Sequence, residues 1–135
     1  VEAVADRLQI DGLADVFVGV QRNGSGEDDV ILLGDLNVDE YHLGRLGQLP
    51  GIAYAVTGVT TNTRRDKLYD NLVFDRRTTT EYTGKWGVLD LMDEFHLTQE
   101  AALDVSDHCP VWAEFSVYEG GVAPMVASRP DADAK

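Results

Sequence analysis

Three short polar motifs carry the side chains in this sequence that are best suited to catalysis. They are Gly34-Asp35-Leu36-Asn37, Tyr69-Asp70-Asn71 and Ser106-Asp107-His108. Each adjoins an apolar run typical of a strand, and a carboxylate in such a place is unfavourable unless it is paired, hydrogen-bonded or bound to a metal. Together the motifs supply a metal-binding carboxylate, a group that orients water, and an imidazole backed by an acid. This combination indicates phosphoryl-transfer chemistry.

The third motif, taken alone, has two interpretations. In the first, Ser106 and Asp107 are turn formers, and the stretch is an ordinary polar turn before a strand. Alternatively, an acid and an imidazole lie side by side at a strand end, where α/β enzymes commonly place catalytic groups. Only the two other motifs favour the catalytic interpretation.

The hydrophobic pattern predicts the elements that must position these motifs. In chain order we expect a helix at 1–22, a strand buried on both faces at 30–37, a short helix at 39–49, a strand at 53–57, a loop at 57–67, a strand at 68–75 with a hairpin return arm at 78–83, an extended run at 86–91, a helix capped by Thr98 at 97–103, and a strand at 111–117. This order predicts an α/β fold in layers with a mixed sheet. Residues 120–135 have no periodic apolar face and predict a disordered tail.

Length and charge limit the function classes. A chain of 135 residues suggests one domain, and no window is apolar enough for a membrane span. The net charge of −13 argues against a general nucleic-acid binder, but not against a hydrolase whose carboxylates hold cations. Five basic residues cluster in the sequence, and they predict either a solvated face or a phosphate-facing patch. They are Arg64, Arg65, Lys67, Arg76 and Arg77.

The cysteine and the two other histidines are expected to be non-catalytic. Cys109 is the single cysteine, so an intrachain disulfide is excluded, and it is expected to be a small buried residue rather than a nucleophile. His42 and His96 are expected at the surface. The chain begins with Val1 rather than Met, so the lack of a signal peptide does not exclude secretion.

In this order and context, the three motifs resemble the C-terminal motifs of the endonuclease/exonuclease/phosphatase superfamily. The deoxyribonuclease I-like branch is the most similar, because residues 97–111 (LTQEAALDVSDHCPV) have its helix-then-motif form and residues 26–37 have its approach to the first motif. Leu36 stands where the family usually has Phe. The resemblance covers about residues 1–117.

The resemblance implies half of a four-layer α/β/β/α sandwich with a mixed, mainly antiparallel sheet. Residues 1–119 would be the C-terminal half of the domain, and 120–135 the tail. The N-terminal half of the same domain would be the missing partner, supplying an Asn, a metal-binding Glu and a second His. The chain alone is then expected to be inactive. It should also expose the sheet face that packs against the other half, with Val30, Leu32, Leu72, Phe74 or their neighbours.

Metal and catalytic roles carry over from the family by position. Asp107 and Asp35 would bind a divalent cation, Mg²⁺ before Mn²⁺ or Ca²⁺, and Asp35 would also position water. His108 would act as a base or as an electrostatic partner of the phosphate. Asp70 would hold its imidazole in one tautomer. Asn37 would donate hydrogen bonds to the phosphate.

Three further residues are expected to contact the substrate phosphate: Asn71, Arg64 and Arg65. Relatives from animals often have a disulfide at positions that correspond here to Glu40 and Lys67, whose opposite charges would pair instead. That departure suggests a bacterial relative, and leaves secretion or a periplasmic location open.

The function implied is metal-dependent phosphodiester hydrolysis by a DNase I-like endonuclease, with DNA or another phosphodiester as substrate and no organic cofactor. The same motifs serve phosphatases of inositol lipids, sphingomyelin hydrolases and abasic-site repair enzymes, so a lipid or small phosphoester is the alternative. A non-catalytic binding module that retains the fold is a further alternative. Loss of an acid or of the histidine would indicate it, and none is lost.

Overall fold

A computed structural model describes residues 2–23, 26 and 28–121 of the chain. The elements, in order, are α1 (Glu2–Asn23), β1 (Ile31–Asp35), α2 (Gly44–Gln48), β2 (Ile52–Tyr54), β3 (Asp70–Asp75), β4 (Tyr82–Val88), α3 (Leu91–Phe95), α4 (Gln99–Val105), β5 (Val111–Phe115) and the 3₁₀ turn η1 (Glu119–Gly121). The predicted tail lies outside the described residues from 122 onward. Within the described part, no helix is both long and apolar enough to cross a membrane.

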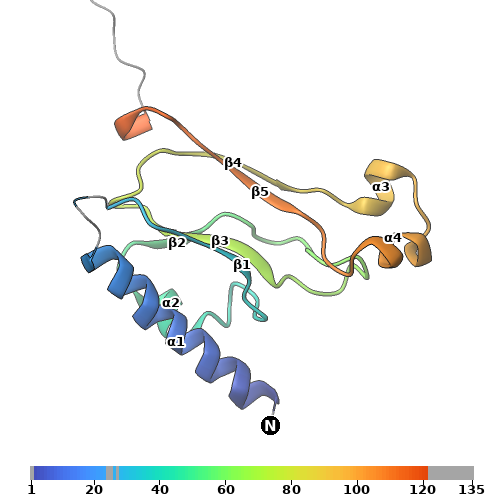
Figure 1. Ribbon diagram of the computed structural model, residues 1–135, viewed down its shortest axis with the longest axis horizontal. Helices are drawn as coiled ribbons and strands as arrows, with labels where there is room; N and C mark the ends of the chain where they lie inside the picture. Colours follow the sequence, from blue (N-terminus) through green and yellow to red (C-terminus); the bar gives the residue numbers. More distant parts are fainter. Residues whose placement is uncertain (1, 24–25, 27, 122–135) are drawn as a thin grey trace, which may run out of the picture.

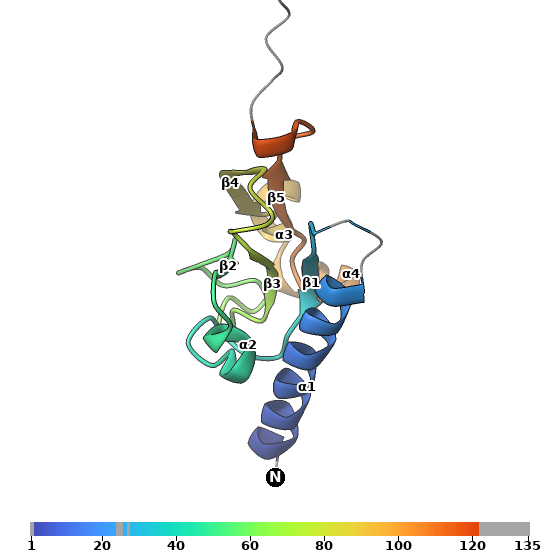
Figure 2. The ribbon, with the colours of Figure 1, turned by 90° about the vertical axis from the view of Figure 1, so that its left-hand side faces the viewer.

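The fold is α/β, with two small sheets and a helical layer (Figure 1). One sheet has the order β1-β3-β2, and the other pairs β4 with β5. Figure 2 shows α1 and α2 on one side of the three-stranded sheet and the β4–β5 pair on the other. Every strand pair that the structure describes is antiparallel, so the mixed sheet expected from the sequence is replaced by two antiparallel ones.

The main core lies between α1, α2 and the three-stranded sheet. Ile10, Ala14 and Phe17 share the buried face of α1 and pack with Leu46 and Val73. Their spacing of four and then three residues places them on one helical stripe, and the predicted helix is confirmed.

The two faces of β1 differ in burial. Leu32 packs against the α1 core, whereas Leu33 is 68% exposed. Successive side chains in a strand point to opposite faces, and at Leu33 the face of β1 opposite α1 is not covered. The expectation of a strand buried on both faces was therefore wrong for the chain by itself.

An aromatic cluster joins the two sheets. The ring of Phe74 on β3 lies 4.9 Å from that of Tyr82 on β4 and 5.4 Å from that of Phe115 on β5, measured between centroids. The predicted hairpin between 68–75 and 78–83 is absent, because β4 leaves β3 and pairs with β5. This arrangement brings β5, and the motif that precedes it, alongside β3.

Two helices near the third motif begin at side-chain caps. Thr98 accepts a hydrogen bond from the backbone of Ala101, as predicted for the start of α4. The sequence reading missed α3, whose cap Asp90 accepts hydrogen bonds from the backbone of Met92 and Asp93. Both caps satisfy amide groups that a helix start would otherwise leave unpaired.

We expect Asp75 to stabilise the fold by about 2 kcal/mol near neutral pH. The side chain of Arg77 donates to both carboxylate oxygens, at 2.9 and 2.6 Å, and this lowers the pKa of Asp75 to about 2 from 3.8. A lowered pKa stabilises the folded state above the unfolded pKa, and the contribution is lost as the pH falls towards 2. Denaturant unfolding of Asp75→Asn in the full-length protein should show this loss at pH 6, and a much smaller one at pH 2.5.

Asp15→Asn is the matched control, because Asp15 pairs with Arg45 at an exposed site. It should cost only ~0–1 kcal/mol. Equal losses for the two variants at pH 6 would contradict the role given to Asp75.

Candidate active site

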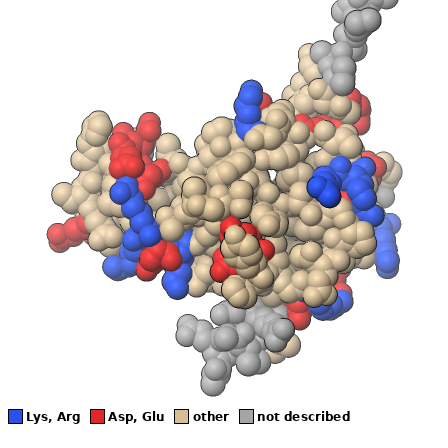
Figure 3. All heavy atoms as spheres, turned by 180° about the vertical axis from the view of Figure 1, so that it is seen from behind, with Lys and Arg blue, Asp and Glu red and all other residues tan. Residues whose placement is uncertain are grey.

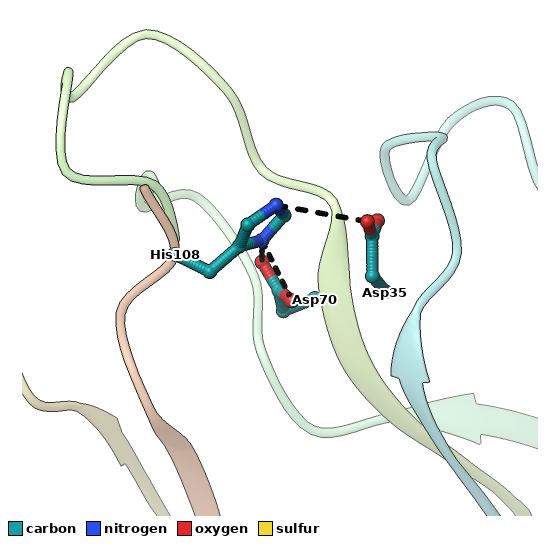
Figure 4. Close-up of side chains that lie close together, drawn as sticks. All are labelled: Asp35, Asp70 and His108. Atoms are coloured by element: carbon teal, nitrogen blue, oxygen red, sulfur yellow. Dashed lines mark hydrogen bonds and ion pairs between the residues drawn. The ribbon is translucent and has the colours of Figure 1, made fainter. Parts of the chain in front are cut away.

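Asp35, Asp70 and His108 form a cluster where the two sheets meet (Figure 4). The imidazole Nδ1 of His108 lies 2.9 Å from Oδ2 of Asp70 and 3.1 Å from Oδ1. Its Nε2 lies 3.7 Å from Oδ2 of Asp35. The contact predicted between Asp70 and His108 is therefore present, and its catalytic role stays a prediction.

Strand register places the two acids of the cluster side by side. Asp35 ends β1, Asp70 begins β3, and the two residues are direct partners in the antiparallel ladder. Like charges directly opposite one another are destabilising, so a cation between them is favoured. The side chain of His108 reaches this position from the segment just before β5.

The surroundings of His108 favour its charged form. Its hydrogen bond with Asp70 raises the pKa of the imidazole above the ordinary value of 6.5, and the charges of Asp70, Asp35 and Asp107 act in the same direction. Burial opposes them only in part, since the side chain is 36% exposed. The site therefore combines a stabilised imidazolium with access for water.

Residues 61–63, here called the threonine strap, connect the strand that carries Asp70 with the segment that carries His108. Asn62 forms an isolated antiparallel bridge with His108. Thr61 and Thr63 are almost wholly buried, at 0% and 1% exposure. The sequence predicted only a loop here, because threonines in a polar stretch look like turn residues and their partners lie far along the chain.

Asn37 and Asp107 lie at the exposed margin of the site. Asn37 has a left-handed backbone (φ 54°), and its backbone amide donates to Oδ1 of Asp35 at 2.9 Å. The backbone carbonyl of Asp107 accepts from Thr63 at 2.9 Å, while its side chain has no hydrogen-bond partner within the described part of the chain. The structure thus leaves the Asp107 carboxylate outside the three-residue cluster, although its charge acts on His108.

The carboxylate oxygens of Asp35 and Asp107 are of the kind that a hard divalent cation prefers. Both oxygens of Asp70 already contact Nδ1 of His108, so Asp70 is placed to orient the imidazole rather than to bind a metal. Asp35, with a side chain that is 37% exposed, and Asp107 have the more accessible carboxylates.

The phosphate role predicted for Asn71 was wrong. Its side chain is 2% exposed and bonds the backbone of Val56, accepting at 2.9 Å and donating at 2.8 Å. Because neighbouring residues in a strand point to opposite faces, Asn71 faces away from the side that carries Asp70. It attaches the segment after β2 to β3.

The basic residues do not form one phosphate-facing patch. Arg65 donates to Asp90 at 2.8 Å and to Asp93 at 2.7 Å, and these contacts raise the pKa of its guanidinium. Arg64 is exposed and has no ion-pair partner among the described residues. The basic side chains visible in Figure 3 fall into separate groups, at the two ends of that face and at its upper edge. A phosphate contact is thus disfavoured for Arg65, and for Arg64 it stays a prediction.

The pairing suggested for Glu40 and Lys67 is also absent. Glu40 accepts from the backbone of Gly58 at 3.0 Å and from the hydroxyl of Thr57 at 3.3 Å. The ammonium of Lys67 lies 5.8 Å from the ring centroid of Tyr69.

The remaining histidines and the cysteine lie where the sequence suggested. His42 is exposed and contacts Asp39 at 2.6 Å, and His96 ends α3 with a left-handed backbone. Cys109 is a buried free thiol, with 4% exposure. None of the three belongs to the cluster of Asp35, Asp70 and His108.

Comparisons with known proteins agree with the motifs. No family model matches the chain. A protein named "Deoxyribonuclease-1-like 1" from Sus scrofa is 36% identical over 127 residues, which are 87% of this chain and 40% of that protein. Its counterpart from Homo sapiens is 33% identical over 128 residues, covering 87% and 42%, and that from Rattus norvegicus is 32% identical over 130 residues, covering 89% and 41%.

The chain thus spans about two fifths of the length of the curated relatives that it matches. The match extends over 87–89% of the chain. The chain is therefore a relative of the deoxyribonuclease I-like proteins.

Proposed function

We propose that the chain is the C-terminal part of the catalytic domain of a divalent-metal-dependent phosphodiesterase, a DNase I-like endonuclease that acts on DNA. In this proposal, residues 1–119 are one half of a four-layer sandwich, and the other half completes the site. The observation that carries the proposal is the hydrogen bond between Asp70 and His108 beside Asp35, at the end of adjoining strands. The name of the relatives supports DNA as the substrate.

His108 would act through Nε2. Its Nδ1 is held by Asp70 at 2.9 Å, so Nδ1 keeps its proton in both charge states of the ring. Nε2 then carries a proton in the imidazolium and a lone pair in the neutral ring. The same atom can stabilise negative charge on the phosphate or accept a proton from the attacking water.

Three other residues would assist around the phosphate. Asp35 lies 3.7 Å from Nε2, so its carboxylate would orient an attacking water that also contacts Nε2. Asn37 is exposed beside it, and its amide group would donate hydrogen bonds to the phosphate oxygens. A divalent cation held by Asp107 and Asp35, which we take to be Mg²⁺ in preference to Mn²⁺ or Ca²⁺, would neutralise phosphate charge.

We expect plasmid cleavage by the full-length protein to require the divalent cation. Supercoiled DNA should be cut in Mg²⁺, left intact in excess EDTA, and cut again when Mg²⁺ is restored. Cleavage that continues unchanged in EDTA would exclude the metal role given to Asp107. Hydrolysis of a lipid or small phosphoester without DNA cleavage would instead favour the alternative substrate class.

A further inference from the structure

We propose that Thr61 is a positioning residue that holds Asp70 and His108 in register with one another. The proposal rests on the function proposed above for that pair. It gives a residue outside the three motifs the role of fixing the position of Asp70 relative to His108. Thr61 lies in the threonine strap and is 0% exposed.

The hydroxyl of Thr61 is directed at Asp70 by its other hydrogen bonds. Its Oγ1 accepts from the backbone amides of Tyr69 at 3.0 Å and of Asp70 at 3.1 Å. A threonine hydroxyl has two acceptor lone pairs and one proton. With both lone pairs occupied, the proton is donated to Oδ2 of Asp70, at 2.7 Å.

The same oxygen of Asp70 serves both neighbours. Oδ2 lies 2.7 Å from the hydroxyl of Thr61 and 2.9 Å from Nδ1 of His108. The carboxylate is therefore held by a fixed donor on one side while it contacts the imidazole on the other. Rotation of the carboxylate away from His108 would break the bond to Thr61, and the unpaired donor would be buried.

The backbone of Thr61 holds the other member of the pair. Its carbonyl accepts from the amide of Cys109, the residue after His108, at 2.7 Å. Its own amide donates to the carbonyl of Lys67 at 2.7 Å, which ties the strap to the approach to β3. Asp70 lies in one sheet and His108 adjoins the other, so a single buried residue bonds both sides of their contact.

Thr61→Val is the decisive substitution, because valine keeps the branched shape and removes the hydroxyl. In the full-length protein we expect kcat for plasmid cleavage to fall about 10- to 100-fold, with KM unchanged, since a small displacement of a catalytic group has effects of this size. Thr61→Ser keeps the hydroxyl and should restore most of kcat. A kcat that stays within a factor of about two of the wild-type value in Thr61→Val would overturn the proposal.

A spectroscopic measurement distinguishes a positioning role of Thr61 from an effect on stability alone. It also tests that role independently of the proposed function. The proton on Nδ1 of His108, held by a carboxylate, should give a downfield, slowly exchanging proton NMR signal in the full-length protein. We expect the signal to be lost in Thr61→Val and retained in Thr61→Ser. This measurement needs no substrate, so it tests Thr61 even if the protein cleaves no DNA.

Thr63→Val is the matched control. Thr63 is 1% exposed, lies in the same strap, and donates its hydroxyl to the carbonyl of Ser106 at 2.7 Å rather than to Asp70. Its loss should lower the melting temperature much as Thr61→Val does and leave the Nδ1 signal in place. A signal that survives in Thr61→Val, or disappears equally in both variants, would show that Thr61 acts only on stability.

Discussion

Replacing His108 with alanine is expected to lower kcat for DNA cleavage by at least ~10²-fold, which is the lower range for a positioned acid or base. His108 is the imidazole that lies between Asp35 and Asp70, and Nε2 is its atom on the Asp35 side. Alanine removes both the proton-accepting group and the positive charge near the phosphate. Single-turnover cleavage of saturating DNA by the full-length protein would measure the loss directly.

Asp70→Asn should lower kcat as well, and the two effects should not multiply. Asp70 acts on the reaction through the imidazole, so its contribution disappears when His108 is gone. The double variant should therefore be close to His108→Ala alone. A double variant whose loss equals the product of the two single losses would contradict the pairing.

Without the proposed other half of the domain, the chain is expected to self-associate and to be inactive. Leu33 is 68% exposed on the sheet face that also carries Asp35, and its ladder partner Leu72 is only partly buried. The sequence indicates Val30, Leu32 and Phe74 as well, but Val30 and Leu32 pack against the α1 core and Phe74 is buried, at 1% exposure. The patch therefore centres on Leu33 and Leu72, and the other half of the domain would cover it.

Analytical ultracentrifugation of residues 1–135 at micromolar concentration tests this expectation. We predict oligomers that Leu33→Ser reduces, and that Leu8→Ser, at a site 71% exposed on α1, does not. Addition of the other half of the domain should restore solubility and metal-dependent cleavage. A cooperatively melting monomer would show that the chain is a complete domain.

Local signals predicted the parts of the fold that depend on neighbouring residues. The helix at α1, the cap at Thr98, the strand at β5 and the three strand-end motifs are all encoded within a few positions, and the structure has each of them. Cys109 is buried, as expected because free cysteine is among the most buried residue types.

The parts that depend on distant partners could not be predicted in this way. The pairing of β4 with β5, the ion pairs of Arg65 with Asp90 and Asp93, and the bond of Asn71 to Val56 join residues 15 or more positions apart. The role proposed for Thr61 could not be predicted in this way either, because it depends on where Cys109 lies in the folded chain.

The most direct test of the account compares His108→Ala with His42→Ala in one plasmid-relaxation assay of the full-length protein in Mg²⁺. Both variants remove an imidazole that contacts an aspartate, at 2.9 Å for His108 and 2.6 Å for His42, but only His108 lies in the cluster with Asp35 and Asp70. We predict that His42→Ala relaxes the plasmid at the wild-type rate, while His108→Ala is slower by at least ~10²-fold. Equal rates for the two variants would contradict the claim that this cluster is the site of phosphodiester hydrolysis.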